Sequence, residues 1–281
     1  MPLTPTDEIV RSAAQGGVGV GAFNVVQLEH AEAIVSGAEA AGRPVILQIS
    51  ENTARYHGAL GPIGLATLAV ARASNAPVAV HLDHAESADL VHEAVELGFT
   101  SVMFDASRLP YGKNVAATRG DHGPLPRLER MGPRGNSARS EARTVRTPPG
   151  VRTDPDEARD FVAATAVDAL AVAVGSSHAM LTRDAVLDFA LISRLRDAVS
   201  VPLVLHGSSG VGDAGLAKAV EAGMTKVNVS THLNKAFTQA ARTYLEAHPE
   251  TADPRKYLGP ARDAVATEVA RLLGLLHGEL G

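Results

Sequence analysis

Histidines and one aspartate stand where apolar runs of this sequence end. Asp83 and His84 close the run "VAVHLDH", His178 follows "ALAVAVGSS", and His206 lies near the end of "VPLVLHGSS". Such groups are costly to bury unless they are paired or bind a metal. Three imidazoles from three segments could bind one divalent ion and leave a fourth position open, as in catalytic zinc sites. Asp83 beside them could exchange protons as a general acid or base.

Composition limits the classes of protein to consider. The chain has 281 residues, a net charge of −5 and no cysteine, so a metal would need His, Asp or Glu ligands. The negative charge argues against a nucleic-acid partner. The apolar stretches are too short to span a membrane, and "MPLTPTDEIVRSAA" lacks the pattern of a signal peptide. We therefore expect a cytoplasmic protein without a nucleic-acid or membrane partner.

The elements that must position these residues alternate along the chain. Helical patterns separate apolar runs that resemble buried parallel strands, and one helix should begin after an N-cap at Asp154. The predicted strands cover residues 18–25, 44–50, 77–84, 100–107, 169–177, 201–209 and 226–231. An eighth strand between residues 107 and 169 would close a (β/α)8 barrel. The sequence thus predicts an α/β fold, a TIM barrel formed by a single domain over residues 1–281.

Polar residues gather where the predicted strands end. In a barrel the active site forms at the C-terminal ends of the strands. One histidine at such a place is most often structural, but a set drawn from seven strands indicates a site. The set comprises Asn24, Ser50, Asp83, His84, Asp105, Ser177, His178, His206 and Asn228.

Two loops rich in small polar residues follow the last two strands. "HGSSGV" contains Gly207 and Gly210, which allow tight turns, and "NVSTHLNKAF" contains Ser230 and Thr231. Barrels often bind phosphate in loops at these positions, with backbone N–H groups and a helix N-terminus. Alternatively, Ser230 and Thr231 cap the following helix.

The motifs together resemble a known enzyme family. In order along the chain stand "GAFNV", "PVILQIS", "HLDH", "GFTSVMFDAS", "TDPDEARDFV", "DALAVAVGSSH", "PLVLHGSSGV", "KVNVST" and "DPRKYLGPARDAV". This series resembles the class II, metal-dependent ketose-1,6-bisphosphate aldolases of carbohydrate metabolism and glycolysis. The resemblance implies reversible aldol cleavage of fructose or tagatose 1,6-bisphosphate to dihydroxyacetone phosphate and glyceraldehyde 3-phosphate, without deciding between the two sugars.

The resemblance also implies roles for individual residues. His84, His178 and His206 match the zinc ligands, Asp83 the acid/base at the C4 hydroxyl, and Asp105 a second metal position. The matches to substrate-binding positions are Asn24, Ser50, Ala179, Gly207, Ser208, Ser209, Asn228, Val229, Ser230, Thr231 and Arg255. In some members the arginine comes from a neighbouring subunit. The family further implies a homodimer or homotetramer and a K⁺ or Na⁺ ion near the phosphate. The helix expected at about residues 257–278 is a candidate contact surface between subunits, and its apolar stripe could equally pack on its own barrel.

The segment from about residue 119 to 149 departs from the family. It is rich in Arg, Gly and Pro and has no apolar run for strand five, so we expect a barrel with two unpaired edges. The resemblance implies a glutamate in a loop of this region, which removes the proton from dihydroxyacetone phosphate, and another on strand five near the metal. Neither has a clear counterpart, and Glu141 is the nearest candidate for the loop glutamate. We hypothesise that this segment was translated from the wrong reading frame. The alternative function is therefore a catalytically impaired homologue that binds metal or sugar phosphate.

Overall fold

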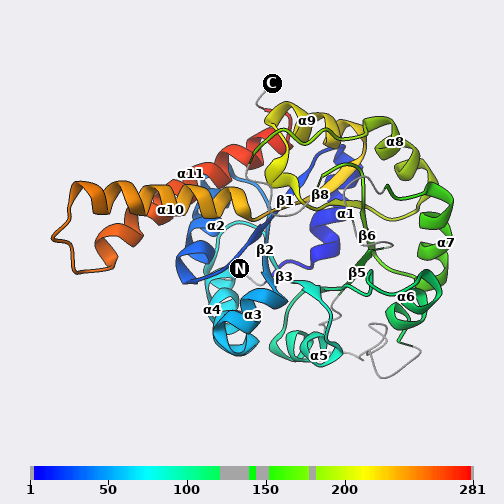
Figure 1. The fold of residues 1–281 in the computed structure, drawn as a ribbon, viewed down its shortest axis with the longest axis horizontal. Coiled ribbons are helices and arrows are strands. Elements are labelled where there is room, and N and C mark those ends of the chain that lie inside the picture. The colour runs from blue at the N-terminus through cyan, green and yellow to red at the C-terminus, as the bar shows by residue number, and fades with distance from the viewer. Residues whose placement is uncertain (1–2, 121–138, 144–151, 177–181, 280–281) are drawn as a thin grey trace.

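Eight parallel strands close into a barrel in chain order (Figure 1). The computed structural model describes residues 3–120, 139–143, 152–176 and 182–279. The strands are β1 (Val20–Asn24), β2 (Val45–Ser50), β3 (Val78–Ala85), β4 (Ser101–Phe104), β5 (Arg139–Arg143), β6 (Ala169–Val172), β7 (Leu203–Leu205) and β8 (Met224–Val229). β8 pairs with β1, which completes the barrel. The predicted TIM-barrel fold is confirmed.

Helices pack against the barrel. They are α1 (Thr6–Gly16), α2 (Leu28–Ala41), α3 (Glu51–His57), α4 (Leu60–Ala73), α5 (Ala88–Leu97), α6 (Tyr111–Thr118), α7 (Pro155–Thr165), α8 (Phe189–Ala198), the 3₁₀ turn η1 (Ser208–Gly210), α9 (Asp213–Ala222), α10 (Thr231–Ala247) and α11 (Arg255–Leu276). Most of them surround the barrel and cover its outer face, but α1 lies at the centre of the ring of strands in Figure 1 and contacts β1, β3 and β8. α10 and α11 pack on each other and project away from the barrel. None of the helices in the described ranges has the length and hydropathy needed to cross a bilayer.

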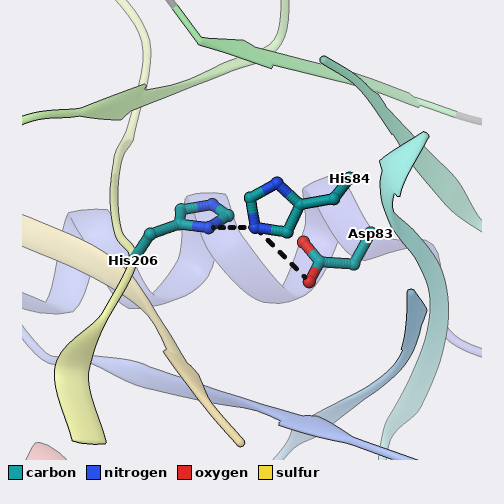
Figure 2. A group of neighbouring side chains, drawn as sticks. All are labelled: Asp83, His84 and His206. Carbon is teal, nitrogen blue, oxygen red and sulfur yellow. Dashed lines mark hydrogen bonds and ion pairs between the residues drawn. The ribbon is translucent and has the colours of Figure 1, made fainter. Parts of the chain in front are cut away.

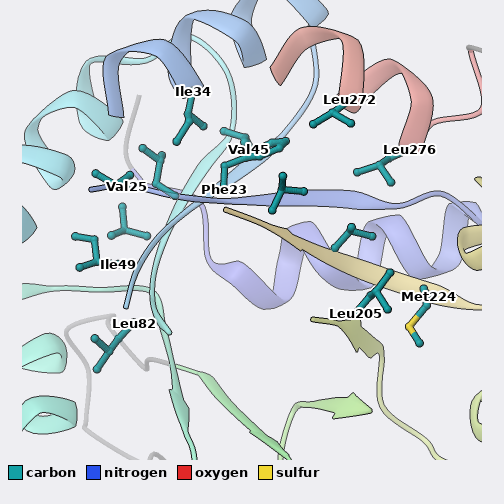
Figure 3. Close-up of a cluster of buried hydrophobic side chains, with 14 of the residues drawn as sticks. Phe23, Val25, Ile34, Val45, Ile49, Leu82, Leu205, Met224, Leu272 and Leu276 are labelled. Carbon is teal, nitrogen blue, oxygen red and sulfur yellow. The ribbon is translucent and has the colours of Figure 1, made fainter. Parts of the chain in front are cut away.

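The strands form where the apolar runs predicted them because both sides of each strand are covered. Figure 3 shows Phe23, Val45 and Leu82 from the strands packed in one apolar cluster with Ile34 and Leu272 from the surrounding helices. α7 begins as predicted, since the Asp154 carboxylate accepts hydrogen bonds from two backbone N–H groups of the first turn, both at 3.0 Å.

β5 corrects one sequence prediction. Residues 139–143 run parallel to β4 and β6 and pair with both, so the expectation of a missing strand and two unpaired edges was wrong. Ladder hydrogen bonds use backbone groups, which every residue except proline supplies in full. The sequence "RSEAR" contains neither proline nor glycine, and apolar patterning alone could not find it. Residues 121–138 and 144–149 lie outside the described ranges, so the reading-frame hypothesis stays a prediction.

Candidate active site

The end of β3 directs two consecutive side chains to one point. The pairing of β3 with β4 shifts register between Leu82 and Ala85, and His84 has a φ of +54°. Consecutive side chains of a regular strand point to opposite faces, and an irregularity of this kind changes that direction. Asp83 and His84 consequently both line a cavity at the C-terminal end of the barrel (Figure 2).

His206 approaches His84 from the opposite side of the barrel. It follows β7 directly, Gly207 turns the chain with a φ of +67°, and the Ser176 hydroxyl donates to the His206 carbonyl at 2.5 Å. His206 Nδ1 lies 2.9 Å from His84 Nε2 (Figure 2). Two nitrogens bound to one tetrahedral zinc lie about 3.3 Å apart, given Zn–N bonds of about 2.0–2.1 Å. The two imidazoles are therefore slightly closer than two ligands of one tetrahedral zinc, and near enough to share an ion.

A carboxylate completes this cluster. Ligand atoms of Asp83, His84 and His206 all lie within 4.8 Å of one another. Two imidazoles and a carboxylate are donors that suit a divalent ion such as zinc. The side-chain amide of Asn228 contacts two members of this cluster. Its Nδ2 donates to Asp83 Oδ1 at 3.3 Å and lies 3.4 Å from His206 Nε2.

Asp105 contacts the second ring nitrogen of His84, Nδ1. Asp105 Oδ2 lies 2.8 Å from His84 Nδ1, and the Ser107 hydroxyl donates to Asp105 Oδ1 at 2.5 Å. A carboxylate that accepts from one ring nitrogen leaves the other nitrogen unprotonated and oriented for a metal. The structure thus brings Asp105 to the nitrogen of His84 that faces away from His206. Its predicted place at a second metal position stays a prediction.

The cavity beside this cluster has a volume of about 270 Å³, and all of its lining residues except Gly207 have polar side chains. Its lining consists of Asn24, Gln48, Ser50, Asn52, Asp83, His84, His206, Gly207, Ser209, Asn228, Ser230 and Thr231. Gln48 and Asn52 were not among the residues predicted from the sequence. Gln48 Nε2 donates to Asn24 Oδ1 at 2.7 Å. Gln48 stands two residues before Ser50, and strand alternation could have placed both side chains on one face.

One end of the cavity is suited to an anion. α10 begins there with Thr231, its first turn contains no acidic residue, and Ser230 makes no side-chain capping bond. The alternative prediction of a capping hydroxyl is therefore wrong for Ser230. Ser209 Oγ accepts a hydrogen bond from the His232 N–H at 3.2 Å, which brings the loop after β7 against this helix. Helix N-termini bind phosphate through their backbone N–H groups.

Other predicted substrate residues lie elsewhere. The buried Ser208 hydroxyl donates to the Asn228 carbonyl, and Val229 is buried at the end of β8. Arg255 begins α11 at the outer end of the α10–α11 projection, where its side chain is 88% exposed and pairs with Asp253 at 2.8 Å. His178 and Ala179 fall outside the described residues.

Known proteins resemble this chain over almost its whole length. Residues 4–279 match the family described as "Fructose-bisphosphate aldolase class-II". The chain belongs to this aldolase family. The resemblance found in the sequence is thereby confirmed across almost the whole chain, and it identifies the protein as an aldolase, a carbon–carbon lyase.

Solved aldolases have the same fold as this family member. The YdjI aldolase from Escherichia coli K12 is 29% identical, with a TM-score of 0.84 over 98% of this chain and 97% of that chain. The fructose-bisphosphate aldolase Fba from Campylobacter jejuni is 19% identical, with a TM-score of 0.81 over 98% of this chain and 95% of that chain. The second comparison concerns the fold alone.

Proposed function

We propose that this chain is a zinc-dependent aldolase that reversibly cleaves fructose or tagatose 1,6-bisphosphate to dihydroxyacetone phosphate and glyceraldehyde 3-phosphate. The observation that carries the proposal is the meeting of Asp83, His84 and His206 at one point of the barrel rim, in a member of this family.

The metal would be held by His84 and His206, with His178 as the predicted third ligand. When bound, a divalent ion supplies Lewis-acid polarisation of the ketose carbonyl. The chain's own contribution begins with Asp105, whose carboxylate keeps Nε2 of His84 available and oriented.

Asp83 has the surroundings of the acid/base. Its side chain is almost fully buried beside the histidines, and Asn228 occupies one carboxylate oxygen. The other oxygen is left to exchange a proton with the C4 hydroxyl as the C–C bond breaks or forms. A positioned acid/base of this kind contributes about 10²–10⁴ in rate.

The phosphates would bind at opposite ends of the cavity. Gly207, Ser209 and Thr231 would bind the phosphate on the dihydroxyacetone side, where the N-terminus of α10 lies. Ser50 would contact the other phosphate. The exposure of Arg255 at the outer end of the α10–α11 projection supports its contribution to the cavity of a second copy, and hence a homodimer or homotetramer.

The alternative proposal is a catalytically impaired homologue that binds metal or sugar phosphate. The observation that favours it is the position of Glu141, which lies within β5 opposite Met103 and Ala169 rather than in a loop. The family's loop glutamate then has no counterpart among the described residues.

A coupled aldolase assay separates the two proposals. The zinc-loaded protein should cleave one or both sugar bisphosphates, and a chelator should abolish turnover until zinc is restored. His84→Ala should bind less than a tenth of the zinc and lose turnover by at least about 10²-fold. His248→Ala, at an exposed histidine beside Tyr244, is the matched control and should change neither quantity. Zinc uptake without turnover supports the impaired homologue, and full turnover in His84→Ala contradicts the aldolase proposal.

A further inference from the structure

His232 does not line the cavity, but its backbone is hydrogen-bonded to Ser209, which does. Its imidazole lies in a separate groove between α10 and α11, while its backbone N–H donates to Ser209 Oγ at 3.2 Å. A hydroxyl that accepts this bond keeps its own proton for another partner. The position of the His232 backbone therefore determines where the Ser209 hydroxyl can donate a hydrogen bond.

The imidazole of His232 is held by a carboxylate on the neighbouring helix. His232 Nε2 lies 2.6 Å from Glu268 Oε1 of α11. Arg271 donates to both oxygens of Glu268, at 2.6 and 2.9 Å. Burial raises the pKa of Glu268, but the hydrogen bonds and charges of Arg271 and His232 outweigh this and lower it to about 2. Since an ionised carboxylate only accepts hydrogen bonds, Nε2 of His232 is the donor.

The chain of charges continues to the loop after β7. Arg271 Nη1 donates to Asp213 Oδ2 at 2.6 Å, and Arg183 Nη2 donates to Asp213 Oδ1 at 2.5 Å. Arg183 Nε also donates to the Val211 carbonyl at 3.0 Å. Glu268, which holds His232, is thus joined through the ion pairs of Arg271, Asp213 and Arg183 and the Arg183–Val211 hydrogen bond to the loop that carries Ser209. Both sides of the His232–Ser209 bond therefore belong to one network.

We infer that His232 is a positioning residue for phosphate, which, held by Glu268, fixes the first turn of α10 and thereby aims the Ser209 hydroxyl and the helix N–H groups at the substrate's phosphate. This inference rests on the proposed function only in its assignment of the phosphate to this end of the cavity. His232 thus acts through its backbone, and the His232 ring does not contact the substrate.

The test uses inorganic phosphate as the probe on the zinc-loaded full-length protein. His232→Ala and Glu268→Gln should each raise the dissociation constant for phosphate, measured by isothermal titration, about tenfold. The KM for the sugar bisphosphate should rise by a similar factor while kcat stays within about twofold. His232→Gln retains a donor for Glu268 and should recover most of the affinity. Glu32→Gln breaks a different ion pair of α11, with Arg262 at 3.1 Å, and is the control that should change nothing.

Unchanged phosphate affinity in His232→Ala and Glu268→Gln would overturn the inference, as would a fall in kcat at constant KM. A lowered melting temperature with normal phosphate affinity would also overturn it, because the network would then only hold α10 against α11. Should the unaltered protein bind phosphate but cleave no sugar, the proposed function fails while the titrations still decide the role of His232. An unaltered protein that binds no phosphate would overturn this inference.

Discussion

At His84 the backbone adopts a conformation that residues other than glycine rarely take, with a φ of +54°. Such a conformation costs on the order of 1–3 kcal/mol and persists where the surroundings enforce it. Here Asp105 and His206 hold the two ring nitrogens of His84. The strain is thus located at the residue whose direction matters most for a metal site, and Asp105 is the neighbour that fixes that direction.

Asp105→Asn should weaken zinc binding without abolishing it. The amide can still contact His84 Nδ1, but it no longer stabilises the ring with a negative charge. Removal of such a partner typically costs about 10–100-fold in metal affinity. Competition with a chromophoric chelator measures the zinc dissociation constant. Asp197→Asn, at an exposed aspartate paired with Arg196, is the control. Equal zinc affinity in Asp105→Asn and the unaltered protein would contradict the orienting role.

The residues of the site could be predicted only in part. Asp83, His84 and His206 were found because costly polar groups end apolar runs. The register shift that turns Asp83 and His84 to one cavity depends on the pairing of β3 with β4, which no local pattern displays. Gln48 was missed, although it shares a face with Ser50. For Arg255 the motif gave the residue, but only the structure shows that it begins α11, which projects with α10 away from the barrel.

Among the elements, α2 and α11 share an extensive helix–helix contact along the barrel wall. Gly37 of α2 faces α11, and a Cβ at this position would lie 2.6 Å from the Ala266 carbonyl oxygen and 2.8 Å from Val269 Cβ. The helices can approach this closely because glycine has no side chain. The same contact secures the inner half of α11, whose outer end carries Arg255.

Gly37→Ala should lower the free energy of unfolding by about 1–3 kcal/mol, because overpacking against backbone outweighs the roughly 1 kcal/mol gain in helix propensity. Urea denaturation followed by circular dichroism measures the change. The control is Gly112→Ala in α6, where an added Cβ meets no described atom within 4 Å. That variant should be unchanged or slightly more stable. Equal changes in the free energy of unfolding of the two variants would show that α2 and α11 can move apart without loss of stability.

Elements were predictable where burial imposes a pattern. Each of the seven apolar strands overlaps its predicted run, although β8 begins two residues before its run and β6 and β7 are shorter than theirs. Asp154 caps α7 as its sequence indicated. β5 was not predictable, since its place is determined by the free edges of β4 and β6 and not by its own five residues. The residue types of a short strand do not show which neighbouring strands its backbone pairs with.

For the whole molecule, buried titratable groups determine how stability depends on pH. His30 is 4% exposed and stacks on Phe237, with ring centroids 4.9 Å apart. Burial lowers the pKa of His30 from 6.5 to about 4. Below pH 6.5 the unfolded chain therefore binds a proton that the folded chain excludes, and stability falls as the pH drops towards 4. Glu268, with its pKa near 2, stabilises the fold above pH 4.5 and loses that contribution only at lower pH.

His30→Leu should flatten this dependence. Between pH 7 and pH 4 the unaltered protein should lose about 3 kcal/mol more free energy of unfolding than the variant, which is the value of the shift in the pKa of His30. Urea denaturation at a series of pH values measures the difference. His248→Leu replaces an exposed histidine and should follow the unaltered protein. A parallel pH dependence in His30→Leu would contradict the assignment of this acid sensitivity to His30.

The left-handed residue at the end of β3 also has a consequence for handling the protein. Zinc that binds only the folded chain would stabilise it by about 4 kcal/mol when its concentration is a thousandfold above its dissociation constant. This is more than the cost of the left-handed backbone conformation at His84. We therefore expect protein treated with EDTA and then freed of the chelator to lose heat resistance relative to protein kept in zinc buffer, although their sequences are identical.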